Sequence, residues 1–150
     1  MKIRKSNTTD HPALVELWFR SVQATHTFLS ERDIEDLYPE VRDTYLPSVD
    51  VWVAEGGDGE IVGFIGLHSA QVEMLFVDPT KFGLGAGTAL LDHARKLAAN
   101  LTVDVNEQNP RAHNFYRHYG FEETGRSVTD SAGRPFPLIH MALSGSGGAR

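Results

Sequence analysis

Residues 77–91 read Val77-Asp-Pro-Thr-Lys-Phe-Gly83-Leu-Gly85-Ala-Gly87-Thr-Ala-Leu-Leu91. An apolar run typical of a strand ends at Asp78-Pro79, three glycines follow at alternate positions, and an amphipathic helix begins directly after them. Glycine allows sharp backbone turns and lets a ligand approach the main chain without meeting a Cβ. The N–H groups of a helix's first turn have no internal partner and carry partial positive charge. This stretch therefore predicts a site for phosphate or diphosphate.

Two common phosphate-binding motifs fit this loop poorly. A P-loop ends in Gly-Lys-Ser/Thr, whereas Gly87 is followed directly by Thr88. A Rossmann fingerprint is Gly-x-Gly-x-x-Gly in an opening βαβ unit, and this loop lies in mid-chain after a hairpin. A nucleotide-phosphate-binding protein nevertheless stays open as an alternative.

Upstream of the loop, the pattern changes from helices to strands. One helix is expected from near Asp10 and a second after Ser30, whose hydroxyl can cap it, although Pro39 must shorten or bend the second. Apolar alternation then predicts strands at residues 51–54, 61–67 and 72–77, the first two joined as a hairpin by the glycines of 56–59.

Downstream of the loop, helices and strands alternate. The helix after Gly87 carries Leu90, Leu91, Ala94, Leu97 and Ala98 on one face, and strands are expected at 101–105, 121–128 and 136–143. A further helix begins at Asn109-Pro110 and ends at Gly120. With residues 2–5 as a short first strand, this order predicts an α/β fold of the α+β kind with a mixed sheet.

Composition excludes several classes of protein. The chain has 150 residues, no cysteine and a formal charge of −6, which fits one domain, here expected over residues 1–143, with a flexible tail at 144–150. Disulfide scaffolds, cysteine-rich zinc sites and catalytic thiols are excluded, and histidine spacing predicts no metal site. We expect a cytoplasmic protein without nucleic-acid or membrane partners, because no basic surface, export signal or spanning segment is evident.

A second informative segment is Asn106-Glu-Gln-Asn109-Pro-Arg-Ala112-His-Asn-Phe115-Tyr116-Arg-His-Tyr-Gly120-Phe121. Taken alone, Asn109 is explained as a helix N-cap. The aromatic residues, Tyr116 included, are explained equally well as a core-facing helical stripe. Spacing alone leaves the role of Tyr116 open.

Together the two segments resemble the GNAT superfamily of N-acetyltransferases. The superfamily's glycine loop, Gln/Arg-x-x-Gly-x-Gly/Ala after Val-x-Pro, resembles Val77-Asp-Pro79 followed by Phe82-Gly-Leu-Gly85-Ala-Gly87. Its later motif, Asn-x-x-Ala-x-x-Phe-Tyr-x-x-x-Gly-Phe, is similar at every fixed position of residues 109–121. More narrowly, residues 20–29 and 105–109 resemble the small bacterial YjaB-type branch. The expected order of elements follows the superfamily through nearly the whole chain.

The resemblance implies an acetyl-CoA site. The diphosphate is expected on the main chain of the glycine loop and the pantetheine along the strand before it, with Asn109 and Asn106 as further partners. The implied acetyl-CoA-binding residues are Leu75, Phe76, Val77, Phe82, Gly83, Leu84, Gly85, Ala86, Gly87, Thr88, Asn106, Asn109 and Tyr116. Phe82 departs from the superfamily's usual Arg or Gln, so we expect weaker binding, partly offset by the charge of Lys81.

The resemblance also implies that Tyr116 protonates the leaving thiolate. The ordinary pKa values of phenol and thiol are about 10 and about 8.5, which suits this transfer. Without cysteine, the amine is expected to attack bound acetyl-CoA directly in a ternary complex. Two residues are candidate bases: Glu73, on the strand before the loop, and His26, whose ordinary pKa near about 6.5 suits the task.

The sequence thus predicts an N-acetyltransferase that acts on a primary amine of a small molecule or a protein. An acyl-CoA-binding regulatory module without turnover is the alternative, and the departure at Phe82 keeps it open. Monomer and homodimer are both compatible with the sequence.

Overall fold

Seven strands form one mixed sheet in the order β1-β2-β3-β4-β5-β7-β6. The computed structural model describes residues 1–143, so the tail expected at 144–150 lies outside the described residues. Neighbouring strands are antiparallel throughout, except for the parallel pair β4 and β5. The expected mixed sheet is confirmed. The strands are β1 (Lys2–Lys5), β2 (Asp50–Glu55), β3 (Ile61–His68), β4 (Gln71–Val77), β5 (Thr102–Asn106), β6 (Glu122–Ser127) and β7 (Leu138–Ala142).

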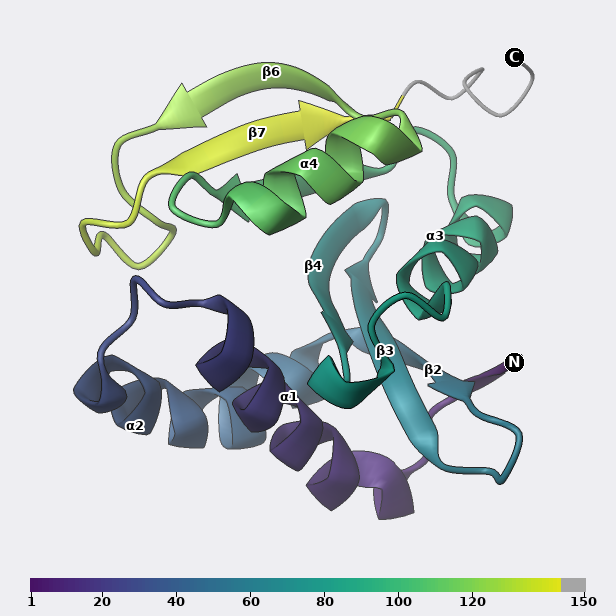
Figure 1. The fold of residues 1–150 in the computed structure, drawn as a ribbon. Coiled ribbons are helices and arrows are strands. Elements are labelled where there is room, and N and C mark those ends of the chain that lie inside the picture. Colours follow the sequence, from purple (N-terminus) through teal and green to yellow (C-terminus); the bar gives the residue numbers. More distant parts are fainter. Residues whose placement is uncertain (144–150) are drawn as a thin grey trace.

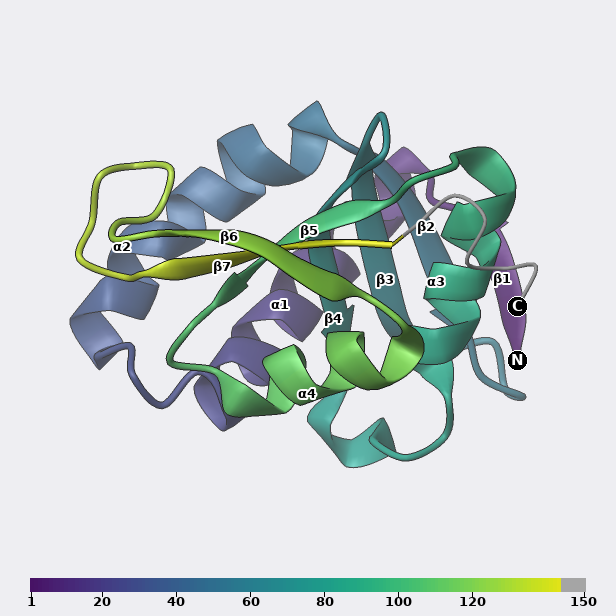
Figure 2. The same cartoon turned by 90° about the horizontal axis from the view of Figure 1, so that it is seen from above.

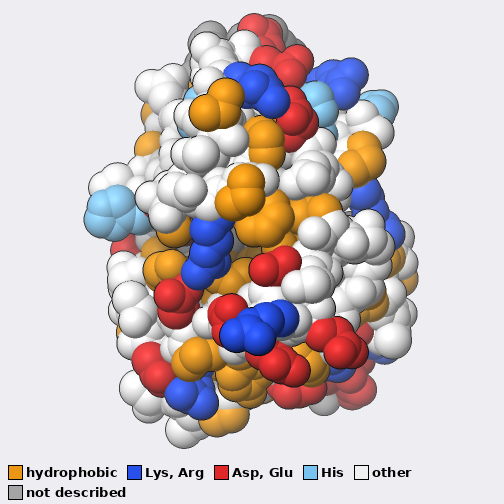
Figure 3. Space-filling model, turned by 90° about the vertical axis from the view of Figure 1, so that its left-hand side faces the viewer, with side chains coloured by type: hydrophobic (Ala, Val, Ile, Leu, Met, Phe, Trp, Pro, Cys, Tyr) orange, Lys and Arg blue, Asp and Glu red, His pale blue; other side chains and the backbone are white. Residues whose placement is uncertain are grey.

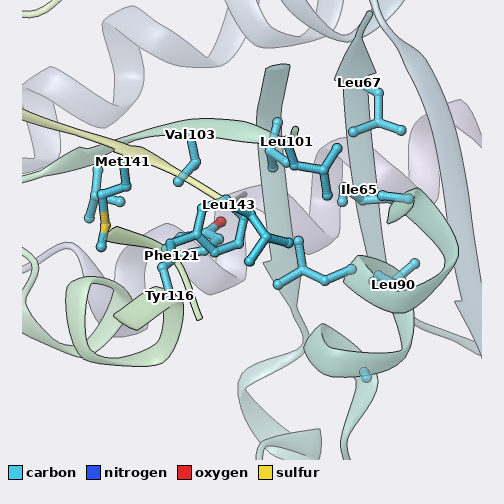
Figure 4. Packing of buried hydrophobic residues seen from close by; sticks show 14 of the residues in the cluster. Ile65, Leu67, Leu90, Leu101, Val103, Tyr116, Phe121, Met141 and Leu143 are labelled. Carbon is cyan, nitrogen blue, oxygen red and sulfur yellow. The ribbon is translucent and has the colours of Figure 1, made fainter. Parts of the chain in front are cut away.

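Within residues 1–143, four α-helices cover the two faces of this sheet: α1 (His11–Thr25), α2 (Glu31–Glu40), α3 (Ala86–Leu97) and α4 (Pro110–Tyr119). Helices α1 and α2 pack against one face of β2–β4, around the buried residues Leu14, Trp18 and Phe64. Helices α3 and α4 pack against the opposite face (Figures 1 and 2). Their core contains Leu90, Phe121 and other apolar side chains from both halves of the sheet (Figure 4).

Local sequence signals account for most element boundaries. Ser30 and Asp33 form the capping box that begins α2, and Gly120, with φ of +126°, ends α4. Pro39 lies inside α2 and does not end the helical path, because the chain continues as a π-helical turn at Val41–Tyr45. Leu97 belongs to the apolar face expected for α3, but it is the last residue of the helix and is 51% exposed.

The sheet divides between β4 and β5. These strands pair only at Gln71 with Thr102 and Val72 with Val103, whereas β3 stays paired with β4 as far as Val77. The two halves of the sheet separate beyond that point, and Figure 1 shows β4 diverging from the β6–β7 half of the sheet. None of the helices formed by residues 1–143 is long and apolar enough to span a membrane.

Candidate active site

The gap between β4 and β5 opens into a cavity of about 500 Å³. Because β5 leaves β4 after Val72, the β4 edge at residues 73–77 has no strand partner on this side among the described residues. The N–H and C=O groups of that edge are therefore free to pair with an extended ligand. The cavity is lined by Ser21, Thr25, His26, Val72, Glu73, Met74, Leu75, Phe76, Val77, Lys81, Phe82, Gly83, Gly85, Ala86, Gly87, Thr88, Val103, Asp104, Val105, Asn106, Asn109, Arg111, Ala112, Phe115 and Tyr116.

The glycine loop supplies one wall of the cavity. Gly83 and Gly85 have φ of +88° and +83°, a region that other residues adopt only with strain. Gly85 is the N-cap of α3 and brings no side chain to its N–H groups. The first-turn N–H groups of residues 86–88 therefore remain available to an anion, in a wall that also has the positive end of the helix dipole.

Gly87 has a different role from the other two glycines. A Cβ at this position would lie 3.0 Å from Cζ of Phe115, whereas a Cβ at Gly83 or Gly85 would meet nothing within 4 Å. Gly87 therefore lets the start of α3 pack against the aromatic ring from α4.

We expect Gly87→Ala to destabilise the fold by about 1 kcal/mol, because the cost of crowding Phe115 exceeds the helix propensity gained by alanine. In a Phe115→Leu background the same change should be neutral or stabilising. Urea unfolding of the four variants measures the difference. An equal effect of Gly87→Ala in both backgrounds would exclude the contact as its cause.

Two asparagines lie where β5 leads into α4. The Oδ1 of Asn109 accepts a hydrogen bond from the N–H of Ala112 at 3.2 Å, so the interpretation as an N-cap is confirmed. Asn109 also lines the cavity. The Oδ1 of Asn106 is buried and has no hydrogen-bond partner among residues 1–143. Such an acceptor is costly unless a ligand satisfies it.

Tyr116 belongs to the core and to the cavity wall at once. It is 7% exposed, its ring packs edge-on against Phe115 and Phe121, and Figure 4 shows it beside Phe121. Its hydroxyl makes no hydrogen bond to any described residue, and burial raises its pKa above the ordinary value for a phenol. Tyr119, the competing phenol, instead donates to Asp92 at 2.6 Å and lies outside the cavity lining.

His26 lies at the end of α1, between aromatic rings. Its Nδ1 is 2.8 Å from the Thr25 hydroxyl, and its ring packs against Phe28 and Phe76. Burial lowers the pKa of His26 to about 4. The prediction that His26 acts as a base assumed an ordinary pKa. The enclosed imidazole is instead neutral and weakly basic.

The low pKa of His26 makes the stability of the fold depend on pH. The unfolded chain binds a proton at His26 below about pH 6.5, whereas the folded chain binds it only near pH 4. Stability is therefore lost as pH falls through this window. We expect His26 to account for about 2 kcal/mol of the stability lost between pH 7 and pH 5. Urea unfolding of wild type and His26→Gln measures this, with exposed His68→Gln as control. Equal pH dependence in wild type and His26→Gln would contradict it.

Glu73 is exposed and lines the cavity from the β4 edge, as expected for a carboxylate near an acceptor. Asp104, on β5, lines the cavity too and was missed. Its Oδ1 lies 2.6 Å from Nδ1 of His140, whose Nε2 lies 2.6 Å from the hydroxyl of Ser127. No spacing in the sequence indicates this contact between three strands.

The remaining predicted residues divide between those that line the cavity and one that does not. Leu75, Phe76, Val77 and Phe82 line it, whereas Leu84 is 62% exposed and lies outside the lining. Arg111 was also missed, although its place two residues after the cap Asn109 was visible in the sequence. On the face seen in Figure 3, hydrophobic side chains gather in a hollow bordered by acidic and basic ones.

The sheet opens between its two parallel strands, beside a glycine loop that begins a helix. This arrangement suits an extended ligand that carries a diphosphate. Residues 47–123 match the family described as the acetyltransferase (GNAT) domain, and the chain belongs to the GNAT family. The chain is 42% identical over 146 residues to the peptidyl-lysine N-acetyltransferase YjaB of Escherichia coli strain K12. The match covers 97% of this chain and 99% of that protein. It is an N-acetyltransferase of this family.

Solved structures agree with this assignment. The solution structure of apo-form YjaB from Escherichia coli matches with a TM-score of 0.88 and 42% identity over 96% of this chain and 97% of that one. The PaiA N-acetyltransferase of Thermoplasma acidophilum, in complex with coenzyme A, has the same fold, with a TM-score of 0.75 and 22% identity over 95% and 98% of the two chains.

Proposed function

We propose that this protein transfers the acetyl group of acetyl-CoA to the side-chain amine of lysine residues in proteins, by direct attack in a ternary complex. The observation that carries the proposal is the free β4 edge, which opens into a cavity beside the glycine loop. The acceptor follows from the name of the 42% identical relative, a peptidyl-lysine N-acetyltransferase. We expect the reaction in the cytoplasm, by a monomer or a homodimer.

The cavity has suitable partners for the diphosphate and the pantetheine of acetyl-CoA. The main chain of residues 83–88 suits the diphosphate, because its first-turn N–H groups have no side-chain cap. The β4 edge at residues 75–77 suits the amides of pantetheine, which can pair with it as a strand would. The unpartnered Oδ1 of Asn106 suits one more amide N–H, and Asn109 lies beside it.

In the proposed reaction, acetyl-CoA supplies an activated thioester. A free N–H of β4 polarises the thioester carbonyl. Tyr116 then donates its phenolic proton to the departing sulfur. A phenol is protonated at neutral pH, and the hydroxyl of Tyr116 lines the cavity with no competing partner among residues 1–143.

We propose Glu73 rather than His26 as the residue that attracts the lysine ammonium and accepts its proton. A carboxylate carries negative charge that draws a cation into the cavity mouth, whereas the imidazole of His26 is neutral, enclosed by Phe28 and Phe76, and weakly basic. His26 is better suited to shape the acceptor side of the cavity.

Ligand binding and turnover distinguish this proposal from its alternatives. Coenzyme A should raise the melting temperature more than ATP or NAD at equal concentration, and greater stabilisation by ATP or NAD would favour a nucleotide-binding protein. Thiol release from acetyl-CoA should then be fastest with lysine peptides among a panel that includes polyamines, amino acids and aminoglycosides. Tight binding of acetyl-CoA without release on any of these amines would favour the regulatory module.

A further inference from the structure

Arg111 projects from the first turn of α4 into the same cavity as the glycine loop. Its guanidinium carbon lies 3.9 Å from the ring centroid of Phe82, close enough for stacking and a cation–π contact. The stack joins α4 to a segment far from it in the sequence. Phe82 directly precedes Gly83, the first glycine of the loop. It places a positive charge at the entrance to the glycine loop.

The charge of Arg111 is free to bind a ligand. Among residues 1–143, no carboxylate lies within ion-pair distance of its guanidinium. Lys81, the other lysine or arginine that lines the cavity, pairs with Glu60 at 3.0 Å, and this contact raises the pKa of Lys81. The expectation that Lys81 offsets the uncharged Phe82 is therefore poorly supported, because its ammonium already has a carboxylate partner.

We propose that Arg111 binds the diphosphate of coenzyme A and that Phe82 holds its guanidinium in place for this contact. The inference rests on the proposed function and deepens it. A flat guanidinium stacked on a ring keeps its edge N–H donors free, and those donors match phosphate oxygens in pairs. Stacking also reduces the side-chain freedom that a flexible arginine would lose on binding. The main chain of the glycine loop and Arg111 would then hold the diphosphate from two sides.

Calorimetric titration of Arg111→Ala with coenzyme A, dephospho-coenzyme A and pantetheine tests the proposal. We expect the Kd of the first two ligands to rise by about 10- to 100-fold, as for loss of a charge-assisted bond. Pantetheine, which has no phosphate, should bind as it does to wild type. A loss confined to coenzyme A would assign Arg111 to the 3′-phosphate and overturn the proposal, as would unchanged affinity for both phosphorylated ligands.

Two further variants separate this role from a structural one. Arg117→Ala is the matched control, because Arg117 lies exposed on the same helix, bonds Asn114 and is outside the cavity lining. Its Kd values should equal those of wild type. Phe82→Arg in the Arg111→Ala background places a guanidinium at the other residue of the stacked pair. This double variant should recover most of the lost affinity for coenzyme A. Failure to recover any would contradict the assignment.

The proposed function can fail separately from this inference. If wild type neither binds coenzyme A nor releases thiol from acetyl-CoA with any amine, the proposed function is wrong. If wild type does both and Arg111→Ala binds coenzyme A as tightly as wild type, only the role of Arg111 is wrong.

Discussion

Tyr116→Phe should lower kcat for acetyl transfer by about 10²- to 10³-fold and leave the Kd for acetyl-CoA within about threefold of wild type. The substitution removes one oxygen from a ring that stays packed against Phe115 and Phe121, so the core is preserved. What is lost is the proton that we assign to the departing sulfur. Steady-state kinetics with a lysine peptide and calorimetric titration with acetyl-CoA measure the two quantities.

Tyr119→Phe is the matched control for this prediction. Its hydroxyl lies on the same helix but bonds Asp92 and is outside the cavity lining, so kcat should change by no more than about threefold. Equal losses of kcat in the two variants would mean that the chemistry does not depend on Tyr116. A rise in Kd with kcat unchanged would make Tyr116 a binding residue only.

Glu73→Gln should lower kcat/KM for a lysine peptide by about 10- to 100-fold, because the neutral amide can neither attract the ammonium nor accept its proton. The change keeps the size of an exposed side chain at the cavity edge, so the fold should be unaffected. Binding of acetyl-CoA should also be unaffected. The loss should shrink at high pH, where more of the lysine amine is already neutral.

Glu16→Gln removes another exposed carboxylate, on α1 and away from the cavity lining, and should keep the kcat/KM of wild type. If Glu73→Gln and Glu16→Gln behave alike, the acceptor is deprotonated elsewhere. Asp104, the other carboxylate in the lining, would then be the next residue to test.

Much of the fold was predictable because local signals marked its boundaries. Ser30 and Gly120 stand at helix ends where their chemistry is required, and the glycines of 56–59 join two strands that pair as a hairpin. Leu97 shows the limit of such signals. Its spacing is that of a core residue, but burial depends on whether another element covers the end of α3, and Leu97 is 51% exposed there.

The candidate site was only partly predictable, because its defining feature is not local. Strands β4 and β5 both have apolar, strand-forming sequences, and nothing in either indicates that pairing stops at Val72 and Val103. Gly83 and Gly87 look alike in the sequence, but one is needed for its φ and the other for contact with Phe115.

Burial and contacts between distant segments also changed what could be assigned to His26 and Arg111. An ordinary pKa made His26 attractive as a base, and only its enclosure by aromatic rings shows why that pKa is lowered. The sequence does not show that Arg111 stacks on Phe82, because the two residues come from distant segments.

The most direct test of the account is mass spectrometry of a lysine peptide incubated with acetyl-CoA and the purified protein. We expect the peptide to gain the mass of one acetyl group at its lysine, far faster than with heat-denatured protein. The Tyr116→Phe variant should reduce that rate to a small fraction of the wild-type value. No acetylated peptide above the heat-denatured control, from a protein that demonstrably binds acetyl-CoA, would contradict the account.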